Sequence, residues 1–513
     1  MTNPQAPADH GYLSHRQILI VLAGLMAGMF LAALDMSIVG TALPRIVSDL
    51  GGLNHLSWVV TAYLLTSTSS TPLWGKISDL YGRRPMFQTA ITVFVAGSVL
   101  SALAQSMAML IGGRAIQGIG AGGLMALALS IVGDIIPPRE RGRYQGYFGA
   151  VFGFSSVSGP LVGGWFTDGP GWEWIFWINV PIGIAALVTT TVALRAMPKI
   201  RREHRIDYLG AAVIVASVTA ILLYTAWAGN EYGWTDPYSL ALLAGGIALA
   251  GLFIWVESRA EEPIIPLRLF RNRVFSPTVA FTALLGIAMF GGIIFLPVYF
   301  QVVQGMTPTE SGLALVPMMA GILLTSIGSG RLMTRTGRYK VFPIVGAGVV
   351  TVAYLLLRTL GADTPYWQVG LFIFVLGAGL GFTMQTVVTA VQNAVERRDM
   401  GAATSSVAFF RTMGGAFGTA IFGAVLTSRL GHYLGEAGSA LPSEADIAND
   451  VQAIQALPAQ IHDTVVTAWV NAVQDVFLVA VPFTAIALVL AFLIPELELQ
   501  QADMPATEQV LAD

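Results

Sequence analysis

The sequence predicts an all-α polytopic membrane protein, and three observations support this fold class. Hydrophobic residues make up 55% of the 513 residues, and the mean hydropathy is +0.68. Charged residues make up only 11%, whereas soluble domains carry about 25%. Apolar runs of about 20 residues, the length of a bilayer-spanning helix, recur from end to end of the chain.

Apolar runs of about 18 residues or more predict fourteen membrane-spanning helices. The first eight are expected at residues 17–43, 55–75, 86–105, 107–133, 143–166, 174–194, 208–227 and 238–257. The last six are expected at residues 274–300, 309–333, 341–361, 366–395, 400–429 and 466–494. Residues 104–106, Ala-Gln-Ser, divide the third helix from the fourth. An even number of spans places both termini on the same side of the membrane.

Positive charge predicts which side that is. Most of the 27 lysines and arginines fall in loops on the side of the termini, and the exceptions are Arg45, Arg114, Arg358, Arg411 and Arg429. Because short cytoplasmic loops are enriched in these residues, residues 1–15 and 496–513 are expected to be cytoplasmic tails. The chain contains no cysteine, which excludes disulfides and thiol chemistry.

Two sequence features recur at one offset along the chain. The segment GKISDLYGRRP begins at Gly75, and a looser copy, GRLMTRTGRYK, begins 255 residues later at Gly330. The glycine-rich GPLVGG at Gly159 has a counterpart, GGAFGT, at Gly414, again 255 residues later. This repetition predicts two pseudo-symmetric six-helix bundles. They span residues 16–200 and 273–495, with two inserted helices and cytoplasmic linkers in 201–272 and a long outward loop at 431–464.

Several segments resemble signatures of the major facilitator superfamily, in its fourteen-helix drug:proton antiporter branch. GKISDLYGRRP resembles the loop between the second and third helices of that family. LDMSIVGTALPRI, GGRAIQGIGAGG, SGPLVGGWF and WEWIFWINVPIG resemble further signatures, in the family's order. The resemblance implies two helix bundles around a central cavity that opens alternately to either side. Gly40, where the family often has asparagine, and Thr334, at the position of Asp79 in the second loop copy, depart from the pattern.

The loop after the second helix is predicted to be a conformational latch. The enrichment of positive charge in cytoplasmic loops is enough to explain Lys76, Arg83 and Arg84, but it does not explain the negative charge of Asp79. An anion there can cap a helix N-terminus or pair with Arg83. The resemblance implies that the loop latches the bundles in the outward-facing state and that Asp134 is a further charge partner. The complete set of predicted latch residues is Gly75, Asp79, Gly82, Arg83, Arg84 and Asp134.

Asp35 and Arg114 are predicted to couple transport to protons. Ionisable groups inside a bilayer are costly and usually functional. Counting the helical rise from Arg16 and from Asp134 places both groups at a similar depth, roughly 28–30 Å from the cytoplasmic side. They could share a polar network, although a direct contact does not follow. The alternatives are a static buried ion pair or a carboxylate at the outer interface, but the family's LD motif, which contains Asp35, favours the coupling role.

Other residues in the spans are candidates for a hinge and a substrate cavity. The resemblance implies an antiporter hinge at Gly159, Pro160, Gly163 and Gly164, whereas ordinary packing of small residues is the alternative. Aromatic, methionine and amide side chains suit varied apolar ligands. The possible cavity residues are Met29, Tyr63, Phe290, Phe295, Phe382, Gln385, Phe410 and Arg411, although lipid-facing or packing roles are common for such residues.

The sequence thus predicts a proton-coupled antiporter that exports lipophilic, often cationic, drugs or dyes from the bacterial cytoplasm. It is expected to act as a monomer in the cytoplasmic membrane, without nucleic acid or metal. No cofactor is expected, because the proton gradient drives transport. A first alternative is an exporter of one substrate, such as tetracycline, an endogenous antibiotic, a siderophore or a lipid. A second is a non-transporting receptor or scaffold. No phosphate-binding loop or catalytic set appears, so an enzyme is not expected.

Overall fold

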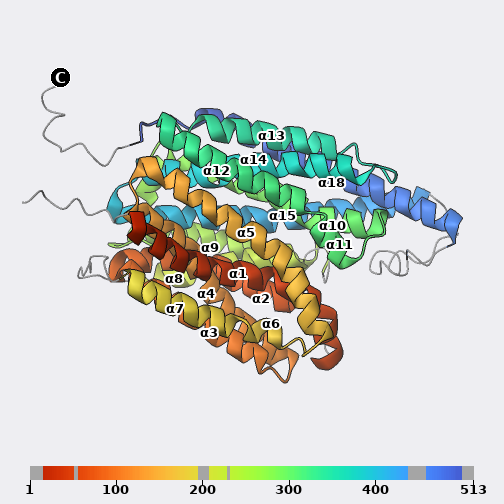
Figure 1. Ribbon diagram of the computed structural model, residues 1–513, viewed down its shortest axis with the longest axis horizontal. Helices are drawn as coiled ribbons and strands as arrows, with labels where there is room; N and C mark the ends of the chain where they lie inside the picture. The colour runs from red at the N-terminus through yellow and green to blue at the C-terminus, as the bar shows by residue number, and fades with distance from the viewer. Residues whose placement is uncertain are drawn as a thin grey trace, which may run out of the picture.

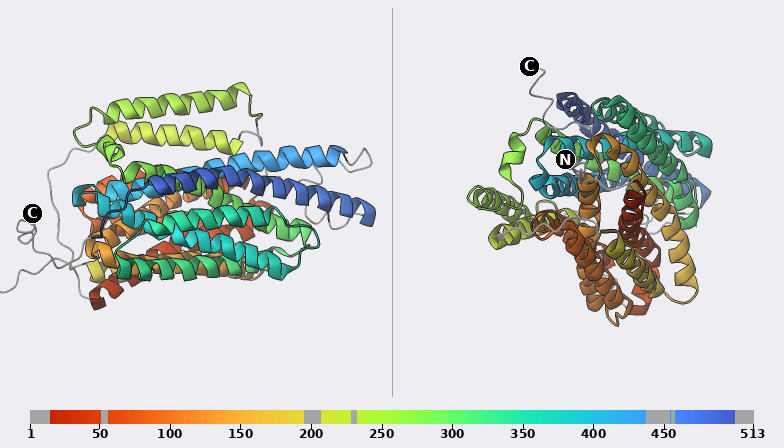
Figure 2. Two further views of the ribbon diagram at one scale, coloured as in Figure 1. Left: turned by 90° about the horizontal axis from the view of Figure 1, so that it is seen from above. Right: turned by 60° about the vertical axis from the view of Figure 1, so that its left-hand side comes forward.

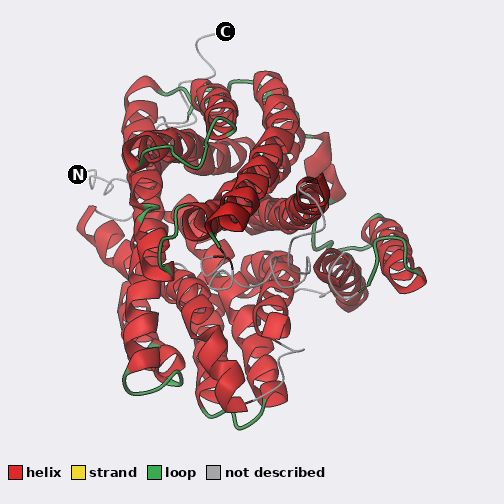
Figure 3. Ribbon diagram, turned by 90° about the vertical axis from the view of Figure 1, so that its right-hand side faces the viewer, coloured by secondary structure: helices red, strands yellow, loops and turns green. Residues whose placement is uncertain are grey.

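The computed structural model describes residues 15–50, 56–194, 207–227, 232–436, 454 and 458–499. Within these ranges the regular elements are helices, and no strand occurs (Figure 3). Most helices run along the long axis of the molecule, and the first turn of α1 and the end of α18 lie at the same end (Figure 1). This all-helical architecture agrees with the predicted fold class.

Six helical segments build the first half of the chain. They are α1 (His15–Leu50), α2 (Leu56–Tyr81), α3 (Arg83–Ala102), α4 (Met107–Ile135), α5 (Pro138–Asp168) and a sixth formed by α6 (Trp174–Trp177) with α7 (Asn179–Ala193). The predicted break at residues 104–106 is confirmed. Ser106 caps α4, because its side chain accepts a hydrogen bond from the backbone N–H of Met109 (3.3 Å).

The rest of the chain contains the inserted pair and the second half. The inserted pair is α8 (Tyr208–Trp227) and α9 (Pro237–Glu257), followed by the short η3 (Leu267–Arg271). The second half comprises α10 (Phe275–Val298) with η4 (Tyr299–Val303), α11 (Pro308–Leu313), α12 (Val316–Thr336), α13 (Val341–Leu357), α14 (Tyr366–Ala394), η5 (Arg397–Asp399), α15 (Met400–Glu436) and α18 (Ala459–Leu493).

Eleven helices in the described part of the chain are long and apolar enough to cross a membrane. The apolar helix α13 has only 17 residues, and α2 and α5 are not among the eleven. In α2 a run of serine and threonine lowers the hydropathy, and α5 begins with several charged residues. Each of the fourteen predicted segments overlaps a helix, but fourteen membrane crossings are not confirmed and stay a prediction.

The predicted outward loop at residues 431–464 differs from the structure at both of its ends. Helix α15 continues to Glu436, and α18 begins at Ala459. The two helices project beyond the rest of the molecule (Figure 2, left). Asp475 joins them by pairing with Arg429 (3.3 Å) and accepting a hydrogen bond from the Tyr433 hydroxyl (3.0 Å). Residues 437–453 and 455–457 of the predicted loop lie outside the described residues.

Helix packing repeats between the two halves. In the first half α1 packs on α5 and α2 on α4, and in the second half α10 packs on α15 and α12 on α14. Each half has its own apolar core. The halves meet where α2 contacts α15 and where α5 contacts α12. The inserted pair lies at the side of the bundle, with α8 against both α2 and α15 (Figure 2, left).

Candidate functional site

The turn between α2 and α3 holds a cluster of charges around Arg83. Gly82 has a φ of 95°, a conformation that favours glycine, and it allows α3 to begin directly after α2. The buried guanidinium of Arg83 pairs with Asp79 (Nη2 to Oδ1, 2.6 Å) and with Asp134 (Nε to Oδ2, 2.6 Å). These two ion pairs hold the adjacent ends of α2, α3 and α4 together. We call this end of the molecule the latch end.

Asp79 also reaches across to the second half. Its carboxylate oxygens accept hydrogen bonds from the backbone N–H groups of Gly401 (3.1 Å) and Ala402 (3.0 Å). These residues lie in the first turn of α15, where unpaired N–H groups and the helix dipole favour a negative charge. One carboxylate therefore joins α2 of the first half to α15 of the second half.

Two further contacts close the latch end between the halves. A Cβ atom at Gly75 would lie 2.1 Å from Ser405 Oγ and 2.7 Å from the carbonyl oxygen of Gly401, so α2 and α15 touch through backbone. Gln392 of α14 donates a hydrogen bond to the carbonyl oxygen of Leu129 in α4 (3.0 Å). The halves are therefore in direct contact at the latch end in this structure.

Five of the six predicted latch residues lie together in this cluster. Arg84 is the exception, because its half-buried side chain makes no ion pair or hydrogen bond with any residue that the structure describes. In the second loop copy, Thr334 donates its hydroxyl to the carbonyl oxygen of Gly330 (2.9 Å) within α12. A neutral hydroxyl that bonds within its own helix provides no carboxylate for the opposite bundle.

A second polar cluster surrounds Asp35 inside the first half. Asp35 is fully buried and forms an ion pair with Arg114 Nη1. Its Oδ1 atom accepts hydrogen bonds from Gln117 Nε2 (2.6 Å) and Asn179 Nδ2 (3.2 Å). The sequence predicts only a similar depth for Asp35 and Arg114, and the structure brings them into direct contact. Helices α1, α4 and α7 all contribute to this cluster, which we call the Asp35 network.

Arg114 has partners besides Asp35. Its Nε donates to the carbonyl oxygen of Val59 (3.2 Å), and its Nη1 also donates to Gln117 Oε1 (2.8 Å). Its Cζ atom lies 4.2 Å from the centre of the Tyr63 ring, a cation–π contact. The guanidinium therefore keeps favourable contacts if the charge of Asp35 is neutralised.

The sequence analysis does not identify Gln117 and Asn179 as members of this network. Gln117 follows Arg114 by three residues, so both lie on one face of α4, and this spacing could have indicated it. Asn179 lies in the motif WINVP, is fully buried, and also donates to Ser98 Oγ (3.0 Å). No local signal in the sequence pairs α7 with α1 at this depth.

The predicted hinge lies in α5 against α1. A Cβ atom at Gly159 would lie 2.0 Å from Ser37 Oγ, so the two helices approach closely there. Gly163 is buried, whereas a Cβ atom at Gly164 would meet nothing within 4 Å. The side chain of Pro160 lies outside the described part of the chain. Close packing with α1 is therefore a property of Gly159 and not of Gly164.

The predicted cavity residues lie in different environments. Met29 and Phe295 are buried in the cores of the first and second halves, and the Tyr63 hydroxyl donates to the carbonyl oxygen of Ala32 (3.2 Å). Other rings pack against nearby residues: Phe382 against Phe342, Phe290 against Gly415, and Phe410 against Phe270 and Phe409. Gln385 is buried in α14, and Arg411 is half-buried in α15.

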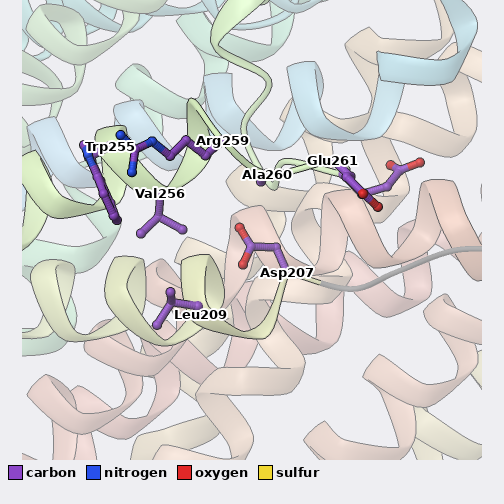
Figure 4. Close-up of a pocket in the computed structure, with 8 residues that line it drawn as sticks. Asp207, Leu209, Trp255, Val256, Arg259, Ala260 and Glu261 are labelled. Atoms are coloured by element: carbon purple, nitrogen blue, oxygen red, sulfur yellow. The ribbon is translucent and has the colours of Figure 1, made fainter.

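A cavity of about 310 Å³ lies beside the inserted pair, and its lining includes no residue of the latch cluster or the Asp35 network. Asp207 and Arg259 are among the residues that line it (Figure 4). Arg259 Cζ lies 4.1 Å from the centre of the Trp255 ring. Glu262, also in the lining, pairs with Lys76 of α2 (2.5 Å), which ties the segment after α9 to the first half. None of the predicted site residues lines this cavity.

Comparison with known proteins is consistent with this architecture. Residues 25–419 match the family model described as Major Facilitator Superfamily. The chain is 43% identical over 484 residues to a protein of Mycobacterium tuberculosis described as an uncharacterized MFS-type transporter, covering 94% of this chain and 70% of that protein. It is 40% identical over 429 residues to the multidrug transporter protein MdtP of Bacillus subtilis, covering 83% of this chain and 78% of the relative.

A solved structure shares the fold. The crystal structure of the human organic anion transporter MFSD10 (TETRAN) superimposes with a TM-score of 0.60 at 15% identity, covering 93% of this chain and 99% of that one. Helical architecture, the family model and the relatives agree with one another. The members of the matched family are transporters rather than enzymes, and this chain belongs to the major facilitator superfamily.

Proposed function

We propose that the chain is a proton-coupled antiporter that exports lipophilic drugs or dyes, cationic ones among them, by alternating access. The observation that carries this proposal is the fully buried Asp35 network in the first half. The name of the multidrug relative at 40% identity supports the substrate class. A bacterial cytoplasmic membrane with cytoplasmic termini is the proposed location, and a monomer is the proposed unit.

Asp35 is the proposed proton carrier because its partners suit both protonation states. When it is ionised, Arg114 compensates the charge, and Gln117 and Asn179 donate hydrogen bonds to it. When it is protonated, Arg114 keeps the Val59 carbonyl and the Gln117 oxygen as acceptors. The Oδ1 atom of Asn179 is buried without a partner and can accept the new carboxyl O–H. Ionised Asp35 forms an ion pair with Arg114, and when Asp35 is protonated Arg114 keeps two neutral acceptors and the Tyr63 ring, so the buried groups have polar partners in both states.

The latch cluster supplies the proposed conformational control. The two hydrogen bonds from α15 to Asp79 exist only while the halves touch at the latch end. Separation of the halves there would expose these N–H groups and open the space between the two bundles toward the latch side. In the proposed cycle the drug binds in that open state and the halves rock to close the latch end. Proton entry at Asp35 then favours the return, with about 2.3 kcal/mol per charge for each 100 mV of membrane potential.

The experiment that tests this proposal is dye transport in inverted membrane vesicles with an imposed pH gradient. Wild type should accumulate dye against its gradient, and Asp35→Asn should abolish that accumulation because the amide cannot carry a proton. Asp49→Asn is the matched control, since Asp49 lies in the same helix but is partly exposed and pairs with Arg45. Full accumulation by Asp35→Asn, at normal protein levels, would show that Asp35 is not the proton carrier.

A further inference from the structure

Arg411 is a charged residue inside an apolar helix long enough to span a membrane, and its side chain has no ion-pair or hydrogen-bond partner among the described residues. It follows Met400, the first residue of α15, by eleven residues, which places it roughly 17 Å along the helix. Arg114 pairs with Asp35 and Arg429 with Asp475, whereas the Arg411 side chain makes no ion pair or hydrogen bond with any described residue. An unpaired cation at such a depth is costly, and charged residues in such positions usually have a function.

The face of α15 that carries Arg411 is linked at Thr404 to the boundary between the halves. Thr404 precedes Arg411 by seven residues, nearly two full turns, so both lie on the same face. Thr404 Oγ1 accepts a hydrogen bond from Gln392 Nε2 (3.3 Å) in α14. The same Gln392 amide donates to the carbonyl oxygen of Leu129 in the first half. Arg411 therefore shares a face of α15 with Thr404, and its backbone packs closely against Gly286 of α10, so the half-buried residue lies between helices.

Gln385 lies at the same level on the neighbouring helix. Helices α14 and α15 are antiparallel, because only a short segment connects them. Moving seven residues back from Gln392 reaches Gln385, and moving seven residues forward from Thr404 reaches Arg411, so both steps climb about 10.5 Å from one contact. Gln385 is 5% exposed, and its Oε1 atom is buried without a hydrogen-bond partner. Two polar side chains that do not use their full hydrogen-bonding capacity thus lie at the same level along the helix axes.

We propose that Arg411 and Gln385 form a subsite for the acidic group of the exported molecule. The proposal rests on the proposed function and adds to it a preference, among lipophilic substrates, for molecules that carry an acidic group, zwitterions included. A guanidinium matches the planar geometry of a carboxylate and can bind it through two parallel hydrogen bonds. The Gln385 amide can donate to the same group or accept from a neighbouring hydroxyl. The ring of Phe290, packed against Gly415 one turn above Arg411, adds an apolar surface for the rest of the molecule.

Binding of two rhodamine dyes to purified protein tests this subsite. The dyes share one cationic ring system and differ only in whether the benzoate is a free carboxylate or a methyl ester. Fluorescence anisotropy gives each Kd without a proton gradient. Wild type should bind the carboxylate dye about tenfold more tightly than the ester, since a desolvated charge-assisted pair has that order of strength. Arg411→Gln should remove the preference by weakening only the carboxylate dye, and Arg411→Lys should retain part of it.

Equal affinity of wild type for the two dyes, or an unchanged preference in Arg411→Gln, overturns the proposal. Affinity for the ester dye reports whether each variant is folded. If Arg411→Gln does not fold, Gln385→Leu takes its place, and it should also weaken the carboxylate dye selectively. The measurement is separate from proton coupling, because Asp35→Asn should keep the dye preference even when it no longer transports. A chain that binds both dyes as predicted but shows no proton-driven transport would contradict the proposed function alone.

Discussion

Gly75→Ala should open the latch end, because Gly75 is where the backbones of α2 and α15 touch. The added Cβ would lie 2.7 Å from the carbonyl oxygen of Gly401, whereas ordinary contacts begin at 3.4 Å. The helices must therefore separate by about 0.7 Å, the difference between these distances. Ser405 Oγ, 2.1 Å from the same Cβ, can rotate away, but Ser405 Cβ at 2.6 Å and the backbone carbonyl cannot, so 0.7 Å is about the smallest separation that suffices.

The cost of this separation follows from the hydrogen bonds of Asp79. A shift of about 0.7 Å lengthens the bonds from Gly401 and Ala402, now 3.1 and 3.0 Å, to about 3.7–3.8 Å, beyond hydrogen-bonding range. Each bond to a charged group contributes about 1.5–3 kcal/mol. Loss of both weakens the closed latch by about 3 kcal/mol or more, which increases the open population roughly a hundredfold.

Labelling of a single cysteine measures that population. The chain has no cysteine, so Ser405→Cys places one thiol, in an otherwise thiol-free protein, against Gly75. A membrane-impermeant maleimide applied from the latch side should label it slowly when Gly75 is present and roughly a hundredfold faster with Gly75→Ala. Gly328→Ala is the matched control, since a Cβ atom there meets nothing within 4 Å.

The result that would refute this reasoning is a labelling rate within about twofold of the parent in Gly75→Ala. That outcome would mean that the helices absorb the methyl group without losing the Asp79 bonds. Faster labelling in the Gly328→Ala control would also contradict it, because the effect would then not depend on the α2–α15 contact.

Three further changes have defined outcomes. Asp79→Asn should lower the transport rate without lowering the amount of protein in the membrane, and normal turnover would contradict the latch role. Gly159→Val crowds Ser37, which should lower the free energy of unfolding by about 1–3 kcal/mol and so lower the thermal midpoint. Gly164→Val should leave the midpoint unchanged, and equal shifts in the two variants would contradict this reasoning. Burial raises the pKa of Tyr339 to about 12. Since an unfolded tyrosine ionises near 10, its contribution is constant below about pH 10 and declines toward pH 12, and Tyr339→Phe should abolish that alkaline decline in stability.

The sequence predicts helices well because the bilayer requires long apolar runs. The break before α4 and the boundaries of α8 and α14 agree with the structure within a few residues. The extension of α15 and α18 is missed because those turns are polar on one side and are stabilised by contacts between the two helices. Arg429 and Asp475 lie 46 residues apart along the chain, and no local pattern connects them.

The candidate site is predictable only in part, for a related reason. Asp35 and Arg114 stand out because charge is rare inside apolar runs. Gln117 and Asn179 are neutral amides whose role depends on which helices are neighbours, and the sequence of one chain does not specify that. The backbone N–H groups of Gly401 and Ala402 donate hydrogen bonds to the Asp79 carboxylate, and no side chain at these positions marks that role in the sequence.

The position of the inserted pair has a mechanical consequence. Helix α8 leans on α2 and on α15 at once, and these two helices belong to opposite halves. When the two halves move relative to each other, the inserted pair cannot keep its contacts with both of them. It must therefore slide along at least one half. Its outer surface carries many exposed apolar side chains, such as Tyr238, Ile247 and Ile254. The inserted pair must therefore move through the surrounding lipid during each transport cycle. A more viscous bilayer, or one of different thickness, should lower the turnover rate.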